Sequence, residues 1–105
     1  MKTTKADVIQ TAADIADKNG LNNVSLKVVA ESLNIRTPSL YNHIDSLESL
    51  LREIAHNGMK TMNERMMQAA IGKIGDDAVK SVGITYLDYM IEHPGIYETI
   101  QWATW

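Results

Sequence analysis

Apolar side chains recur at helical spacing from the start of the chain. Over residues 5–19 they occupy two neighbouring helical rows that merge into one stripe, and they comprise Val8, Ile9, Ala12, Ala13, Ile15 and Ala16. Asn19 and Gly20 follow the stripe, and Gly20 suits the left-handed conformation that closes many helices. The pattern predicts a first helix over residues 5–19 and a short connection over 21–24.

A second, shorter helix is predicted over residues 25–33. Ser25 is a favourable N-cap. The apolar positions after it fall at intervals of three and four residues, and they are Leu26, Val29, Ala30 and Leu33. Asn34 tolerates the left-handed conformation and can end the helix.

A third helix is predicted over residues 37–44. Thr37 would be its N-cap and Pro38 its first residue, a position where the missing N–H of proline costs nothing. The helix has to be short, because Asp45 and Glu48 have the spacing of a capping box that opens the next helix.

Two long helices and the start of a further one complete the pattern. The first has Gly58 in its interior, and its apolar stripe consists of Leu47, Leu50, Leu51, Ile54, Met62, Met66 and Ala69. Gly72 and Gly75 bracket a break, after which Asp76 can cap a helix with the stripe Val79, Val82, Tyr86 and Met90. The His-Pro-Gly tripeptide at 93–95 stops that helix, and the next one opens with Ile96, Tyr97, Ile100 and Trp102. No segment alternates as a half-buried strand does, so the predicted fold class is all-α.

Composition narrows the classes of function. The chain has 105 residues, of which 45% are hydrophobic and 22% charged, as in ordinary globular proteins. It contains no cysteine, which excludes disulfides, thiolate chemistry and zinc sites built on cysteine. No apolar run approaches the roughly 20 residues that span a bilayer, and residues 1–7 are not followed by the apolar segment of a signal peptide. We therefore expect a cytoplasmic protein without a cofactor, a metal or a membrane partner.

The net charge of −3 at first argues against DNA as a partner. Residues 1–45 have five basic and five acidic side chains, whereas residues 46–105 have five basic and eight acidic ones. The first part is therefore neutral, and phosphate binding there would depend on the local placement of charge.

The two short helices and the turn between them have the size of a helix-turn-helix motif. In such a motif the first helix braces against the DNA backbone, and the second offers its N-terminal residues to the major groove. On the helix over 37–44, Leu40 and Ile44 would face the core, which leaves polar side chains on the outer face. The candidate DNA-binding residues are Ser25, Lys27, Arg36, Thr37, Pro38, Ser39, Tyr41, Asn42 and His43.

The chemistry of these residues fits two kinds of contact. Arg36 can reach guanine or a phosphate, and Asn42 can pair with adenine. The hydroxyl groups and His43 can hydrogen-bond phosphates, which fixes register without reading sequence. Tyr41 is expected to be partly packed in the core, with its hydroxyl in solvent. For Arg36, Lys27 and Asn42 the alternative is an ordinary solvated side chain.

The run over residues 24–44 resembles the DNA-binding domain of the TetR family of repressors. The shared features are an alanine-rich first helix, a following glycine, an Ala-x-x-Leu-x-Ile bracing segment and a Leu-Tyr-x-His-Ile recognition segment. Here they are Ala12, Ala13, Gly20, Ala30, Leu33, Ile35, Leu40, Tyr41, His43 and Ile44. The match covers roughly residues 5–55, and the segment 86–97 resembles part of the ligand-binding half of one subgroup. Leu47 is a difference, because the family usually has a lysine there that contacts a phosphate.

The resemblance implies two domains. Residues 1–46 would be a three-helix DNA-binding domain, joined by a long fourth helix to the N-terminal part of a ligand-binding and dimerisation domain over 47–105. It implies a homodimer that binds a double-stranded DNA operator, and a repressor that a small-molecule effector releases from the DNA. Family members run well past residue 105, and their last two helices form the dimer interface, so we expect a truncated chain.

Methionines and aromatic residues of the second half are candidates for the effector pocket. They are Met62, Met66, Tyr86, Tyr89, Tyr97 and Trp102. Methionine adapts to varied ligand shapes, but the same spacing also fits an ordinary helical core. His56 and His93 have no second ligand at metal spacing, so exposed or helix-capping roles are expected for them.

Two other classes of function stay open. An enzyme would need a nucleophile with a base, or two carboxylates in a cleft. Asp76 and Asp77 are adjacent and would point apart on a helix, so no catalytic residue is predicted. A protein-interaction module that uses the helix-turn-helix without DNA would fit the acidic Asp45 and Glu48 beside the third helix.

Overall fold

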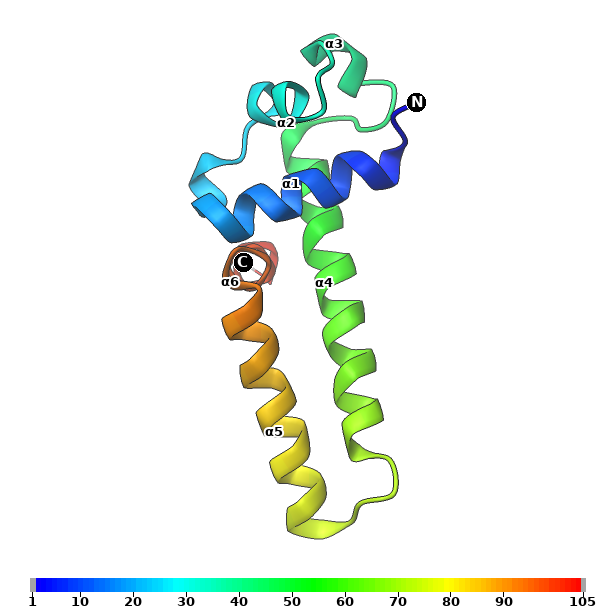
Figure 1. The fold of residues 1–105 in the computed structure, drawn as a ribbon, viewed down its shortest axis with the longest axis vertical. Helices are drawn as coiled ribbons and strands as arrows, with labels where there is room; N and C mark the ends of the chain where they lie inside the picture. The colour runs from blue at the N-terminus through cyan, green and yellow to red at the C-terminus, as the bar shows by residue number, and fades with distance from the viewer. Residues whose placement is uncertain (1, 105) are drawn as a thin grey trace.

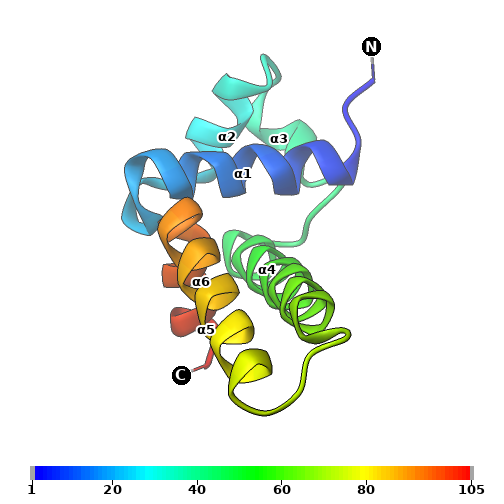
Figure 2. The same cartoon turned by 60° about the horizontal axis from the view of Figure 1, so that its bottom comes forward.

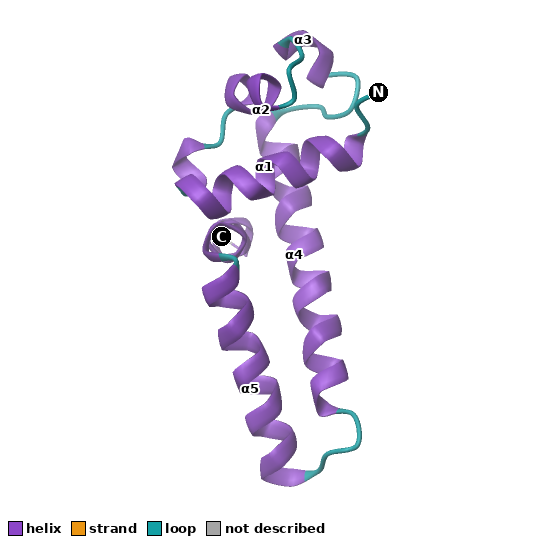
Figure 3. Ribbon diagram, viewed as in Figure 1, coloured by secondary structure: helices purple, strands orange, loops and turns teal. Residues whose placement is uncertain are grey.

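The computed structural model describes residues 2–104, and in this part of the chain all regular structure is helical (Figures 1 and 3). The elements are α1 (Lys5–Asn19), the short 3₁₀ helix η1 (Leu21–Asn23), α2 (Leu26–Ser32), α3 (Thr37–Leu40), α4 (Leu47–Ala70), α5 (Gly75–Glu92) and α6 (Pro94–Thr104). The all-α prediction is confirmed.

The first two helices begin and end where their sequence indicates. Thr4 and Asp7 form a capping box at the start of α1, which satisfies two backbone N–H groups that lack partners within the helix. The Ser25 hydroxyl accepts a hydrogen bond from the Val28 N–H at 3.1 Å, so the predicted N-cap of α2 is confirmed. Asn34 has a φ of +57°, which confirms its left-handed conformation.

The start and the end of α3 differ from the prediction. Arg36 is the N-cap and Thr37 is already helical, because the chain turns one residue early to bond the Ser39 N–H to the Arg36 carbonyl at 2.9 Å. The helix also ends at Leu40 instead of continuing to residue 44. The following N–H groups bond three residues back instead of four, for example Asn42 to Ser39 at 3.2 Å, and this tightens the chain into a turn.

Two further predicted helix caps are wrong. The capping box of α4 is formed by Ser46 and Ser49, each hydroxyl accepting the other residue's N–H at 3.0 Å, so Asp45 and Glu48 do not form it. At α5 the N-cap is Ile74, without a side-chain hydrogen bond. Asp76 instead lies in the first turn, where its negative charge is favourable next to the positive end of the helix dipole.

One hydrophobic core joins the first four α-helices. Its buried members are Val8, Ala12, Ala13, Ala16, Val24, Val29, Ala30, Leu40, Ile44, Leu50 and Ile54. Leu50 and Ile54 belong to α4, so the core continues across the predicted domain boundary at residues 46 and 47. That boundary stays a prediction.

The molecule is elongated, with extents of 52 × 26 × 22 Å. Figure 1 shows α2 and α3 at one end, and α4 and α5 run side by side toward the other end. Figure 2 shows α6 tucked beneath α1 and beside α4, and it contacts both. This contact requires glycine at two positions. A Cβ on Gly58 of α4 would clash with Ile96, and a Cβ on Gly95 of α6 would clash with the Ala16 backbone.

Candidate DNA-binding interface

The turn after α2 and the short α3 lie at the end of the molecule remote from the α4–α5 loop (Figure 1). Two apolar residues fix this segment to the core: Leu40 has an exposed fraction of 0% and Ile44 one of 6%. Both were predicted to face the core, and both do. Their burial turns the intervening residues 41–43 away from the protein interior.

The candidate DNA-binding residues divide into two groups by exposure. Lys27, Arg36, Pro38, Tyr41 and Asn42 are exposed, whereas Ser25, Thr37, Ser39 and His43 are half-buried. The exposed group includes both positive charges and the amide of the set, which are the groups that bind phosphates and base edges.

Tyr41 departs from its predicted packing. Its exposed fraction is 56%, so the ring is not part of the core, and the prediction that it is partly packed is wrong. The physical reason is the early end of α3: the tight turn over 41–43 swings the ring outward. More than half of the Tyr41 surface, rather than its hydroxyl alone, is therefore accessible to a partner.

Local charge at this end is more favourable to phosphate than the net charge suggests. Lys27 and Arg36 take part in none of the ion pairs formed within residues 2–104, which leaves both charges available. Glu48, by contrast, pairs with Arg52 at 3.0 Å on the same helix. This pair offsets part of the acidity that the sequence places after the third helix.

The predicted effector-pocket residues lie between α4, α5 and α6, but they do not share one site. The hydroxyls of Tyr86 and Tyr97 are 3.0 Å apart and their rings pack edge to face. Tyr89 is buried and borders a cavity of about 100 Å³ that Gly58 and Ile96 also line. Trp102 lies against the Arg52 guanidinium instead. A cavity of this volume is well below the roughly 300–1,000 Å³ of ligand sites.

Met62 and Met66 are half-buried on α4. Neither borders the cavity beside Tyr89. Their role in a pocket stays a prediction.

The pKa values of Tyr86 and Tyr89 are raised, so both side chains hold their protons more tightly than usual. The hydrogen bond with Tyr97 is the main cause that raises the pKa of Tyr86 above its ordinary value of 10.0. Burial is the main cause that raises the pKa of Tyr89. The Arg65 guanidinium opposes that shift, and the nearby Asp17 and Glu92 carboxylates add to it.

We expect alkaline pH to destabilise the fold through Tyr89. Its folded pKa is raised above the unfolded value, so its contribution is present below about pH 10 and is lost as the pH rises through the folded pKa. In Tyr89→Phe this group is absent. The free energy of unfolding, measured by urea titration between about pH 8 and pH 11, should therefore fall less in Tyr89→Phe than in the wild type. Parallel profiles for the two proteins would contradict the assignment.

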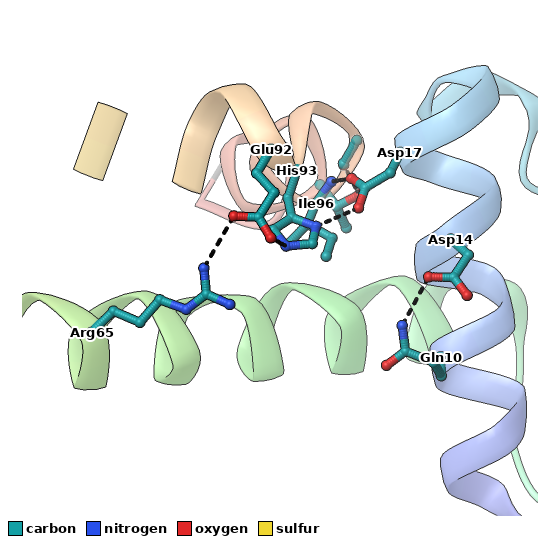
Figure 4. Close-up of polar contacts among 9 residues, drawn as sticks. Gln10, Asp14, Asp17, Arg65, Glu92, His93 and Ile96 are labelled. Carbon is teal, nitrogen blue, oxygen red and sulfur yellow. Dashed lines mark hydrogen bonds and ion pairs between the residues drawn. The ribbon is translucent and has the colours of Figure 1, made fainter. Parts of the chain in front are cut away.

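His93 has a role that the sequence pattern did not reveal. It is the C-cap residue of α5, which confirms the predicted capping role. It is not isolated, however, because its Nδ1 lies 2.7 Å from Oδ2 of Asp17 (Figure 4). The two residues are 76 positions apart in sequence, so no local pattern could have paired them.

In the range 2–104, no three His, Asp or Glu side chains are grouped as metal ligands. No helix in the same range is both long and apolar enough to cross a bilayer.

Known proteins similar to this chain are regulators. The chain is 39% identical over 95 residues to an uncharacterized HTH-type transcriptional regulator, YobS, of Bacillus subtilis (strain 168), and these residues are 90% of the chain and 50% of the relative. It is 30% identical over 96 residues to an uncharacterized HTH-type transcriptional regulator, Rv0681, of Mycobacterium tuberculosis, with 91% of the chain and 44% of the relative covered. The chain thus spans about half the length of the curated relatives it matches. No protein-family model matches the chain. Both relatives are named HTH-type transcriptional regulators, which agrees with the predicted helix-turn-helix, and neither is named as an enzyme.

Proposed function

We propose that this chain is the DNA-reading part of a TetR-type transcriptional regulator, in which α3 and the turn after it bind the major groove of an operator. The observation that carries the proposal is the surface of this segment. Arg36, Tyr41 and Asn42 are exposed on a segment that the buried Leu40 anchors to the core. A rigid support beneath exposed hydrogen-bonding groups is what sequence reading requires.

Two further features support DNA as the partner. The α2 helix contacts α3, as the bracing helix of a helix-turn-helix does. Lys27 on α2 and Arg36 before α3 are both exposed and outside the ion pairs described above. Each could therefore neutralise a phosphate and release a counterion, which makes binding salt-dependent.

The regulatory part of the proposal rests on the arrangement of α4. This helix begins beside the DNA-reading segment and extends to the far end of the molecule (Figure 1). The proposed regulator is a cytoplasmic homodimer that reads two half-sites, and a small molecule bound near Tyr86, Tyr89 and Tyr97 releases it from DNA as a repressor. Such coupling requires that the effector bind the two conformations with different affinities.

The test is a DNA titration of Arg36→Ala. The variant should bind the DNA upstream of its own gene with about 5- to 150-fold lower affinity, because a good arginine contact is worth roughly 1–3 kcal/mol. Fluorescence anisotropy at several salt concentrations measures both the affinity and the number of phosphates neutralised.

Lys80→Ala is the matched control. Lys80 is exposed on α5, so the variant loses one positive charge far from the proposed interface. Equal effects of the two substitutions would show that only net charge matters. Wild-type protein without salt-dependent DNA binding would contradict the proposal and favour the interaction module.

A further inference from the structure

The first turn of α6 is capped by a side chain from α1. Oδ1 of Asp17 accepts the Ile96 N–H at 2.9 Å, and its Oδ2 lies 2.7 Å from Nδ1 of His93 (Figure 4). The first N–H groups of a helix have no partner within it, so Asp17 acts as an N-cap supplied by another helix. The Asp17 and His93 side chains have exposed fractions of 16% and 27%, which limits competition from water.

The contact continues from His93 to α4. Nε2 of His93 lies 3.3 Å from Oε1 of Glu92, and Oε2 of Glu92 lies 3.4 Å from Nη1 of Arg65. Figure 4 shows this series of side chains running from α4, across the end of α5, to α1. Four polar groups therefore join three helices at one place.

A second hydrogen bond at this junction of α1 and α6 has its side-chain acceptor on α6 instead of on α1. The Leu21 N–H, directly after α1, donates to Oε1 of Glu98 on α6 at 2.8 Å. Gly95 packs so closely on Ala16 that a Cβ would overlap its backbone. Hydrogen bonds to backbone groups are directional, whereas apolar burial is not. The junction therefore defines an orientation between α1 and α6 as well as a contact.

This orientation matters because α1 is supported at two places. Leu50 and Ile54 of α4 pack in the core that includes α1, and α6 holds the C-terminal end of α1. The contact with α6 adds a directional constraint to this apolar packing. We infer that Asp17 is the positioning residue of the unit of α1, α2 and α3 and fixes its angle to the α4–α5 pair. The consequence for operator binding rests on the proposed function, since a two-headed reader must keep its recognition helices at fixed spacing.

The angle can be measured without DNA. The chain has no cysteine, so Glu31→Cys and Asp77→Cys, at exposed positions of α2 and α5, introduce two unique sites for spin labels. Pulsed electron paramagnetic resonance on labelled protein diluted with an excess of unlabelled protein then gives the distribution of distances between the two sites of one chain. We expect a single narrow distance in the labelled parent, loss of that single distance in Asp17→Ala, and partial recovery in Asp17→Asn, whose amide oxygen can still accept the Ile96 N–H.

Asp14→Ala is the matched control. Asp14 lies one turn earlier on α1 and accepts a hydrogen bond only from Gln10 of the same helix among the contacts drawn in Figure 4. This variant should keep the narrow distance. A narrow distance retained in Asp17→Ala would overturn the inference.

Two outcomes separate this inference from the proposed function. If Asp17→Ala loses its helical circular dichroism, the distance between the labels is measured in His93→Ala instead. A broader distance distribution supports the inference, and an unchanged one overturns it. A parent protein that binds no DNA contradicts the proposed function, while the distance measurement still decides the role of Asp17. If both hold, Asp17→Ala should bind the operator about 5- to 150-fold more weakly, the usual range of coupling between sites.

Discussion

Replacing Gly95 with alanine should destabilise the protein more than the same change at any other glycine within its helices. The added Cβ would overlap the carbonyl carbon and oxygen of Ala16. These are backbone atoms within α1, so they cannot move aside as the end of a flexible side chain can. We expect a loss of about 3 kcal/mol, at the upper end of the range for overpacking, and a melting temperature lower by more than about 10 °C.

Gly83→Ala is the matched control for this prediction. Gly83 lies in the interior of α5, and a Cβ there would meet no atom within 4 Å. The same chemical change should therefore stabilise the protein by about 0.5–1 kcal/mol, because alanine is the better helix former. Urea unfolding of both variants measures the difference. Similar effects in the two variants would show that α6 does not pack against α1 as described.

These two glycines show what sequence patterns can and cannot predict. The sequence placed His-Pro-Gly at the end of a helix, and α5 does end there. No local pattern indicates that Gly95 tolerates alanine less well than Gly83 does. The reason is a contact of Gly95 with Ala16, which lies 79 residues away in sequence. Local patterns report which residues are helical and which helix faces are apolar, but they do not report which helices touch.

Sequence patterns predict the local structure of α2 and α3 more fully than the contact between α1 and α6. Core spacing correctly buried Leu40 and Ile44, and Ser25 and Asn34 were recognised from their cap and turn chemistry. The errors lie in the length of α3 and in the exposure of Tyr41. Both follow from the turn after Leu40, where hydrogen bonds to the third residue back replace helical ones. A short helix has few helical hydrogen bonds, so the residue at which it ends depends more on tertiary packing than on helix propensity.

Leu40 and Tyr41 are adjacent, yet substitutions there should have opposite consequences. Leu40 has an exposed fraction of 0% and Tyr41 one of 56%. Leu40→Ala removes a fully buried side chain and should cost about 2–5 kcal/mol of unfolding free energy. Tyr41→Ala should change stability by no more than about 0.5 kcal/mol.

For DNA binding, which rests on the proposed function, the two substitutions should act by different routes. Loss of one hydrogen bond to a charged phosphate, worth about 1.5–3 kcal/mol, should weaken operator binding by Tyr41→Ala about 10- to 150-fold while the fold stays intact. Leu40→Ala should weaken binding through unfolding and through loosening of the α3 anchor, so cooling or a stabilising osmolyte should restore binding in Leu40→Ala but not in Tyr41→Ala. Urea titration and fluorescence anisotropy on the same samples separate the two effects. If Tyr41→Ala binds DNA like the wild type, the exposed phenol does not contact the operator, because its removal leaves the anchor of α3 untouched.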